Sequence, residues 1–172
     1  LDYYTPDFGV AGSVTFGAIG RSLVAHCTPE FCRQHIPAIL SGDEVWCQFY
    51  SEPEAGSDLA GIRTRAVQDG ERWIISGSKI WCTNSHIADF VLVAAKTGDD
   101  DSARAINLFI VERGSKGFET PEIKGKLSLR ASDTGEIVLR DCEVPEENRL
   151  PGVQGIKSAL ACLNQARYGI AW

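Results

Sequence analysis

The 172-residue sequence contains no methionine, no Cys-x-x-Cys pair and no apolar run long enough to cross a bilayer. The missing apolar run argues against a transmembrane helix, and no secretory signal pattern opens the chain. An excess of positive charge is also absent, since 17 basic against 23 acidic residues give a net charge of −6. This balance argues against electrostatic binding of nucleic acid or an anionic membrane. Because the chain starts at Leu1 and ends at Trp172 within a helical pattern, we expect a segment of a longer protein.

The six cysteines are scattered, which is typical of reduced thiols and predicts a cytoplasmic or mitochondrial-matrix protein. His26-Cys27, Cys32 and His35 place four potential zinc ligands within ten residues. However, Pro29 divides them between a turn and a helix, whereas structural zinc sites usually join two separated knuckles. We therefore expect buried cysteines and surface histidines here, and no metal site.

Thr28-Pro29-Glu30 predicts a helix start and Ser41-Gly42 its end. Asp69-Gly70 predicts a hairpin and Gly77-Ser78 a further turn. Short runs rich in β-branched and aromatic residues predict seven strands, at Val45–Tyr50, Gly61–Val67, Arg72–Ser76, Lys79–Thr83, Asp89–Lys96, Ala105–Val111 and Glu136–Cys142. The expected fold is α+β: a helical segment at 1–43, a β-barrel or sandwich at 44–152, and the start of a helical bundle at 153–172.

Two short stretches, Gln48–Asp58 and Lys79–Asn84, combine hydroxyl groups with aromatic rings at predicted strand ends. Backbone N–H groups at Ala55-Gly56-Ser57 are open to approach. Rings that stack on a flat face, together with groups that bond its edge, suit a polar heteroaromatic ligand, which we interpret as a flavin. Three alternatives stay open. Trp73 and Trp81 are also explained as core aromatics, Ser51 and Thr83 as strand-end hydroxyls bonding backbone, and Gly56-Ser57-Asp58 as an ordinary turn.

Four motifs occur in order along the chain: Ser51-Glu52-Pro53-x-Ala55-Gly56-Ser57-Asp58, Gly77-x-Lys79-x-Trp81-x-Thr83-Asn84, Leu129-Arg130-Ala131-Ser132-x-Thr134 and Val144-Pro145-x-x-Asn148. This series resembles the acyl-CoA dehydrogenase family, and 162–172 is similar to its glutaryl-CoA dehydrogenase branch. The resemblance implies the end of an N-terminal helical domain, a complete middle β-domain and the first helix of a C-terminal helical domain.

The resemblance also implies FAD as cofactor and an acyl-CoA thioester as substrate. The cofactor-binding residues it implies are Gln48, Tyr50, Ser51, Gly56, Ser57, Trp81, Cys82 and Thr83. Those for the substrate are Ser57, Asn164 and Arg167. In the family Tyr50-Ser51 would bond the pyrimidine side of the flavin, Trp81 would pack on the ring system, and Thr83 would bond near N5. The implied reaction is α,β-dehydrogenation by a homo-oligomer, in which a carboxylate takes the α-proton, hydride goes to FAD and an electron-transfer flavoprotein accepts the electrons.

Among the departures from the family pattern, two bear on catalysis and on the choice of substrate. In the isovaleryl and long-chain types the catalytic Glu would fall at Ala166, so we expect the base beyond Trp172 and no turnover by this segment alone. Glutaryl types bind a distal carboxylate with an Arg-Ser pair, which aligns with Gly9-Val10 and favours a neutral acyl chain instead. The alternatives are a non-catalytic flavin- or partner-binding module and an acyl-CoA oxidase-type relative.

Overall fold

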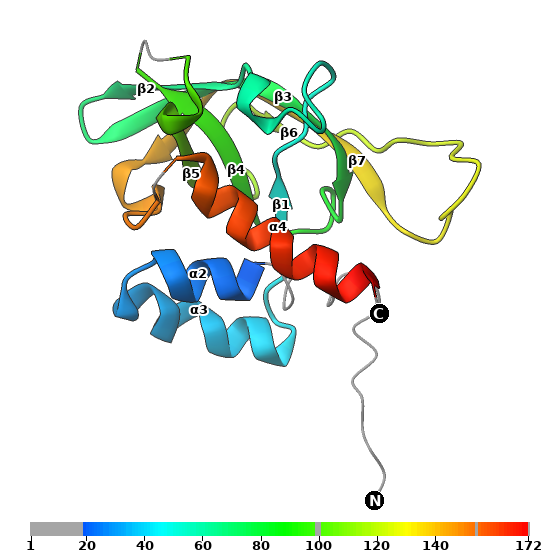
Figure 1. Cartoon of the computed structure of the whole chain (residues 1–172). Helices are drawn as coiled ribbons and strands as arrows, with labels where there is room; N and C mark the ends of the chain where they lie inside the picture. The colour runs from blue at the N-terminus through cyan, green and yellow to red at the C-terminus, as the bar shows by residue number, and fades with distance from the viewer. Residues whose placement is uncertain (1–18, 99–100, 154, 172) are drawn as a thin grey trace, which may run out of the picture.

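The computed structural model describes residues 19–98, 101–153 and 155–171, of which 165, 166 and 168–171 are described in backbone only. Two helices, α2 (Gly20–His26) and α3 (Pro29–Ser41), precede a curled mixed sheet, and a third helix, α4 (Ile156–Ala171), follows it. Figure 1 shows α4 crossing between the sheet and the α2–α3 pair. The α+β fold expected from the sequence is confirmed, and α4 contacts both α2 and β5 (Ile106–Glu112).

Helix α3 begins and ends where the sequence predicts. The Thr28 side chain accepts a hydrogen bond from the Phe31 N–H at 3.2 Å, and Gly42 terminates the helix in a left-handed conformation with φ 83°. The buried face carries His35 and Ile39. The prediction of surface histidines is wrong for His35, which is only 7% exposed. Its polar edge is accommodated because Glu44 accepts its hydrogen bond.

The sheet has the strand order β1-β4-β2-β3-β7-β6, with β5 paired to β4. The bounds of the remaining strands are β1 Trp46–Phe49, β2 Arg65–Asp69, β3 Arg72–Thr83, β4 Phe90–Thr97, β6 Phe118–Glu119 and β7 Thr134–Pro145. Strand β4 runs parallel to β1 and β2 and antiparallel to β5. Its residues Val91–Lys96 are all buried, as expected for a strand covered on both faces.

The structure corrects the predicted division of β3. Two strands separated by a turn at Gly77-Ser78 were expected, but a single strand runs through both residues, and Gly77 pairs with Leu139 of β7. Glycine is required at position 77 because the backbone of Thr64 lies very close to it: a Cβ there would be 2.8 Å from the Thr64 Cα. The Asp69-Gly70 hairpin is confirmed by the pairing of Asp69 with Arg72. The two-residue strand β6 escaped prediction because it is too short to show a pattern.

Within the described ranges, no helix has both the length and the apolar character that a bilayer crossing requires. All six cysteines are described, and all are free thiols. Cys47, Cys82, Cys142 and Cys162 are buried, whereas Cys27 and Cys32 are intermediate. The described residues contain no group of three or more His, Cys, Asp or Glu side chains placed to hold a metal ion.

Candidate functional site

A backbone hydrogen bond joins the two stretches that the sequence analysis singled out. The Ile80 N–H donates to the Ser51 carbonyl oxygen at 3.0 Å, so the end of β1 meets the end of β3 directly. Beyond Ser51 the chain turns back on itself, because Glu52 and Ala55 exchange backbone hydrogen bonds of 2.9 and 3.1 Å. The turn projects Gly56 and Ser57 into solvent, and their N–H groups donate to no described residue.

Beneath this junction lies a buried ion pair. The Lys79 ammonium is 2.7 Å from the Glu52 carboxylate, with side-chain exposures of 0% and 4%. Glu52 also accepts hydrogen bonds from the backbone N–H groups of Arg63 and Thr64 and from the Thr64 hydroxyl, at 2.6, 3.0 and 2.6 Å. The ammonium donates a further hydrogen bond to the Tyr50 carbonyl oxygen at 3.3 Å. The pair therefore ties the 51–58 turn to β3 and to the start of β2.

Burial and charge act differently on the two partners. For Glu52, burial pushes the pKa up, but the charge of Lys79 and the donated hydrogen bonds outweigh it and hold the pKa below its ordinary value. For Lys79, burial is the largest influence and lowers the pKa, although the Glu52 carboxylate opposes it. Each partner is desolvated, so each depends on the other to remain charged.

An acid titration should reveal this pair. Because the Glu52 pKa is lower in the folded chain than in the unfolded chain, its contribution to stability is complete above the ordinary value of 4.5 and is lost as pH falls through the folded value. We expect the urea midpoint of the native protein to fall more steeply below pH 4.5 than that of Glu52→Gln. Parallel pH profiles for the two proteins would contradict this account.

A β-bulge determines which way Trp81 points. Along β3, Trp73, Ile75 and Lys79 are buried at alternate positions, so an unbroken strand would turn residue 81 inward as well. Instead the pairing with β7 slips between Lys79 and Cys82, and Trp81 adopts φ 61°. Trp81 is therefore 64% exposed, whereas Cys82 is fully buried. A large exposed aromatic ring in a strained backbone conformation is a feature of binding sites.

Trp81 separates two cavities. The first, of about 150 Å³, lies between the strand ends and α4. Its lining includes seven of the predicted site residues, Gln48, Tyr50, Ser51, Gly56, Ser57, Trp81 and Arg167, together with Phe49, Leu59, Ile80, Leu160 and Leu163. The second, of about 570 Å³, is lined by Trp81, Thr83, Thr134 and residues of the 123–132 loop. The structure thus brings most of the predicted residues to one side of Trp81 and Thr83 to the other.

The loop that forms the second cavity is held in place by Lys126. Its ammonium donates hydrogen bonds to the Leu129 carbonyl oxygen at 2.9 Å, to the Thr134 hydroxyl at 2.7 Å and to the Ser132 carbonyl oxygen. Thr134 pairs with Thr83 across β7 and β3, so the lysine also braces the strand pair beside the cavity. Leu127 and Leu129 at the loop tip are exposed.

The polar ends of Gln48 and Tyr50 take part in a contact with α4. The Gln48 side-chain oxygen accepts hydrogen bonds from the Cys162 thiol at 2.5 Å and from the Tyr50 hydroxyl at 3.4 Å. Burial raises the pKa of Tyr50 and that of Cys162, so both remain protonated donors at neutral pH. The Gln48 and Tyr50 side chains therefore hold α4 over the first cavity.

Two predicted residues line neither cavity. Cys82 is buried in the core, where burial raises the pKa of its thiol, and Asn164 is exposed on α4. The predictions made for Gly9-Val10 and for the Ala166 side chain fall outside the described residues. Sequence reasoning gave no role to Lys79, although an apolar strand context around a lysine two residues from Trp81 is a usable signal for a buried pair. It also missed Leu160 and Leu163, which line the first cavity.

The structure therefore combines a curled sheet with two cavities at its strand ends, one on each side of Trp81, and α4 lies over the first of them. Residues 47–142 match the family model "Acyl-CoA dehydrogenase, middle domain". The chain belongs to the acyl-CoA dehydrogenase family, which confirms the resemblance drawn from the sequence.

Individual relatives agree with this assignment. Cyclohexane-1-carbonyl-CoA dehydrogenase of Syntrophus aciditrophicus (strain SB) is 40% identical over 136 residues, 78% of this chain and 35% of that protein. Mitochondrial isovaleryl-CoA dehydrogenase of Arabidopsis thaliana is 40% identical over 130 residues, which are 76% of this chain and 32% of that protein. The chain therefore spans about a third of the length of these relatives.

Among solved structures, a Mycobacterium smegmatis glutaryl-CoA dehydrogenase in complex with FADH2 has a TM-score of 0.86 and 40% identity. The match covers 92% of this chain and 40% of that one. Butyryl-CoA dehydrogenase from Megasphaera elsdenii has a TM-score of 0.87 and 30% identity, and the match covers 94% of this chain and 44% of that chain.

Proposed function

We propose that the chain is the cofactor-binding core of an FAD-dependent dehydrogenase that oxidises acyl-CoA thioesters between Cα and Cβ. The observation that carries the proposal is the position of Trp81 as the shared wall of two cavities, with Ser51 on one side and Thr83 on the other. Family membership and the FADH2 complex of a 40% identical relative support the choice of cofactor.

The residues present fit a flavin. A flat ring system needs an aromatic face to pack against and donors and acceptors at its edge. Trp81 offers an exposed ring, Ser51 and Thr83 offer hydroxyl groups, and Gly56 and Ser57 offer N–H groups that bond no described residue. Nothing lies within 4 Å of a Cβ built on Gly56, so the turn is open to a ligand.

In this proposal each part of the chain has a physical task. The Trp81 ring covers one face of the flavin, the hydroxyl groups of Ser51 and Thr83 fix its orientation, and Leu160 and Leu163 of α4 exclude water from the first cavity. Ser57 and Arg167 line that cavity and would contact the acyl-CoA. FAD, when bound, supplies the hydride acceptor. The Glu52–Lys79 pair holds the two loops in register and takes no part in the chemistry.

Further elements of the proposal depend on parts of the protein outside this chain. No carboxylate lines the cavity beside Ser51 among the described residues, so we assign the proton-accepting base to sequence beyond Trp172. On family grounds we also propose an electron-transfer flavoprotein as the electron acceptor and a homo-oligomeric assembly. On the same grounds we propose a division into domains at 1–43, 44–152 and 153–172. A neutral acyl chain is preferred as substrate because Gly9-Val10 carries no charge.

The Thr83→Ala variant, expressed from the complete gene, tests the site. Loss of one hydrogen bond is expected to weaken FAD binding about three- to ten-fold, measured by quenching of flavin fluorescence, and to slow flavin reduction by acyl-CoA under anaerobic conditions. The free energy of unfolding of the apoprotein should change by less than about 0.5 kcal/mol.

The matched control is Thr120→Ala, because Thr120 lines neither cavity. It should leave both flavin measurements unchanged. Equal losses of FAD affinity and stability in Thr83→Ala would contradict a cofactor contact. If the native full-length protein bound FAD but no acyl-CoA reduced the bound flavin, the result would instead favour the non-catalytic flavin-binding module.

A further inference from the structure

The side chain of Gln48 lies in the wall of the first cavity, together with Ser51 and Trp81. Gln48 and Tyr50 alternate with the buried Phe49 along the chain, so their side chains share one face of the extended segment. An amide carries a donor at its nitrogen and an acceptor at its oxygen, and its orientation decides which of them a ligand meets. The tasks proposed so far leave the Gln48 amide without one.

Two donors fix the orientation of this amide. The Gln48 oxygen accepts a hydrogen bond from the Cys162 thiol of α4 at 2.5 Å and a longer one from the Tyr50 hydroxyl at 3.4 Å. Both groups keep their protons at neutral pH, because burial raises the pKa of each. A thiol sulfur is only a weak acceptor, so the reverse orientation would exchange a good acceptor beside Cys162 for a poor one. The amide oxygen therefore faces α4.

The amide nitrogen of Gln48 remains available to a ligand. It donates to no described residue, and the Gln48 side chain is only partly buried. Cys162 does not line the cavity, so it acts on the amide from behind. A donor that is already held in one direction costs a ligand little further loss of side-chain freedom on binding.

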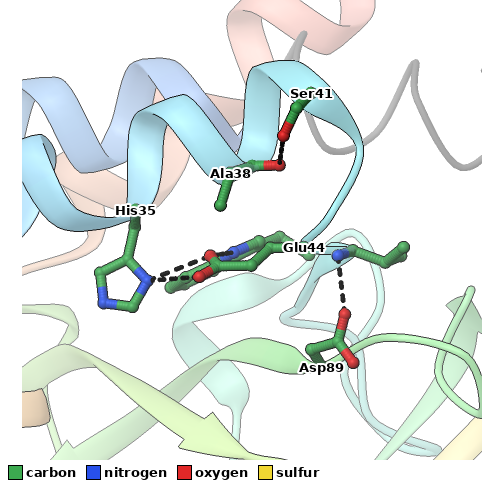
Figure 2. A network of polar contacts seen from close by, with 7 residues as sticks. His35, Ala38, Ser41, Glu44 and Asp89 are labelled. Atoms are coloured by element: carbon green, nitrogen blue, oxygen red, sulfur yellow. Dashed lines mark hydrogen bonds and ion pairs between the residues drawn. The ribbon is translucent and has the colours of Figure 1, made fainter.

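The His35 contact offers a comparison, because its acceptor is used up within the chain. Figure 2 shows the Glu44 carboxylate facing the His35 ring, and His35 Nδ1 lies 3.0 Å from both carboxylate oxygens. The same carboxylate also accepts from the Trp46 indole N–H at 2.8 Å. At Gln48, by contrast, two donors occupy one end of the amide and leave the other end facing a cavity.

We propose that the Gln48 amide nitrogen donates a hydrogen bond to a carbonyl oxygen on the pyrimidine edge of the flavin, and that Cys162 is the positioning residue that directs it. The inference rests on the proposed function, since it requires a flavin beside Trp81. The pyrimidine ring carries both carbonyl oxygens of an isoalloxazine, whereas the opposite edge carries methyl groups. A fixed donor therefore selects the pyrimidine end.

Such a donor changes the reduction potential of the flavin. Reduction places negative charge on the pyrimidine ring, and a hydrogen bond to a charged acceptor is stronger than one to a neutral acceptor. The Gln48 amide therefore stabilises reduced FAD more than oxidised FAD and raises the potential. A residue that only packs against the ring would affect both forms alike.

The test uses the protein expressed from the complete gene, with potentials measured by equilibration against a reference dye. Gln48→Leu should weaken the binding of reduced FAD about five-fold more than that of oxidised FAD. For a two-electron couple this ratio lowers the potential by about 20 mV. Gln48→Glu should lower it further, because a carboxylate offers no donor and repels the reduced ring.

The Cys162 variants test the positioning role separately, and they also serve if Gln48→Leu does not retain FAD. Cys162→Ala leaves only the longer bond from Tyr50, so the ratio of the two affinities should fall about two-fold. Cys162→Ser keeps a donor and should restore most of that ratio. The matched control is Cys142→Ala, a buried thiol of β7 that lines neither cavity beside Trp81 and should leave the potential unchanged even if it lowers stability.

Equal potentials in the native protein and Gln48→Leu would overturn the inference, as would equal shifts in Cys162→Ala and Cys142→Ala. Urea midpoints of the apoproteins give the structural cost of each variant without any flavin. If the native protein bound no FAD, the proposed function would fail and this inference with it. FAD binding with a potential that ignores Gln48 and Cys162 would overturn this inference alone.

Discussion

The Lys79→Met variant is expected to lose about 3–5 kcal/mol of unfolding free energy, the largest effect of any single substitution we describe. Methionine fills similar volume, so packing is nearly conserved, but the Glu52 carboxylate is left buried without its counter-charge. Its remaining partners, the N–H groups of Arg63 and Thr64 and the Thr64 hydroxyl, do not neutralise it. Urea denaturation at pH 7, monitored by tryptophan fluorescence, measures the loss.

The double variant Glu52→Gln/Lys79→Met is the control for this prediction. Because it removes both charges, it should recover part of the stability that Lys79→Met loses. Arg72→Met is the matched exposed case, since its pairs with Asp69 and Glu143 lie at the surface, where solvent screens them, and should stabilise the chain less than the buried pair does. A Lys79→Met loss no greater than that of Arg72→Met would show that the buried pair does not stabilise the junction.

The Gly77→Ala variant is expected to destabilise the chain by about 2–4 kcal/mol. A Cβ at position 77 would lie 2.4 Å from the Thr64 hydroxyl oxygen and 2.8 Å from the Thr64 Cα, and the backbone there has φ 153°. Thr64 cannot move away freely, because its N–H and hydroxyl both donate to Glu52. The substitution should therefore disturb the ion pair as well as β3. Thermal unfolding followed by circular dichroism measures the effect.

Gly70→Ala provides the comparison for Gly77→Ala. Gly70 also has a positive φ, 63°, but nothing lies within 4 Å of its built Cβ. The Gly70→Ala substitution should lower the free energy of unfolding only by the strain of the hairpin turn, about 1 kcal/mol. If the two alanine variants were equally destabilised, close contact with Thr64 would not be the reason for glycine at position 77.

Much of the fold follows from local signals. Thr28 and Gly42 bound α3 because capping depends on neighbouring residues, and the Asp69-Gly70 turn is fixed in the same way. Gly77 was interpreted as a turn because sequence cannot show that its neighbour in space is Thr64. The pairing of Glu52 with Lys79 is likewise a contact between residues 27 apart; the strand context indicates that Lys79 is buried, but it does not identify Glu52 as the partner.

The candidate site was predicted in composition more fully than in geometry. The ordered motifs identified Ser51, Gly56, Ser57 and Trp81, which line one cavity. The division between that cavity and the one beside Thr83 was not predicted, because it arises from the slip in pairing between Lys79 and Cys82. His35 was assigned to the surface, since only the folded chain brings Glu44 to its ring.

The slip in pairing means that strand length, rather than side-chain chemistry, decides what β3 presents to a ligand. Lys79 and Cys82 are three positions apart on β3, whereas their partners Ile137 and Gly135 are two apart on β7, and this one extra residue keeps Cys82 inward and leaves the Trp81 ring outside. Exchange of Trp81 for another aromatic residue leaves the direction of the ring unchanged. The number of residues between Lys79 and Thr83 therefore carries as much information as their identity.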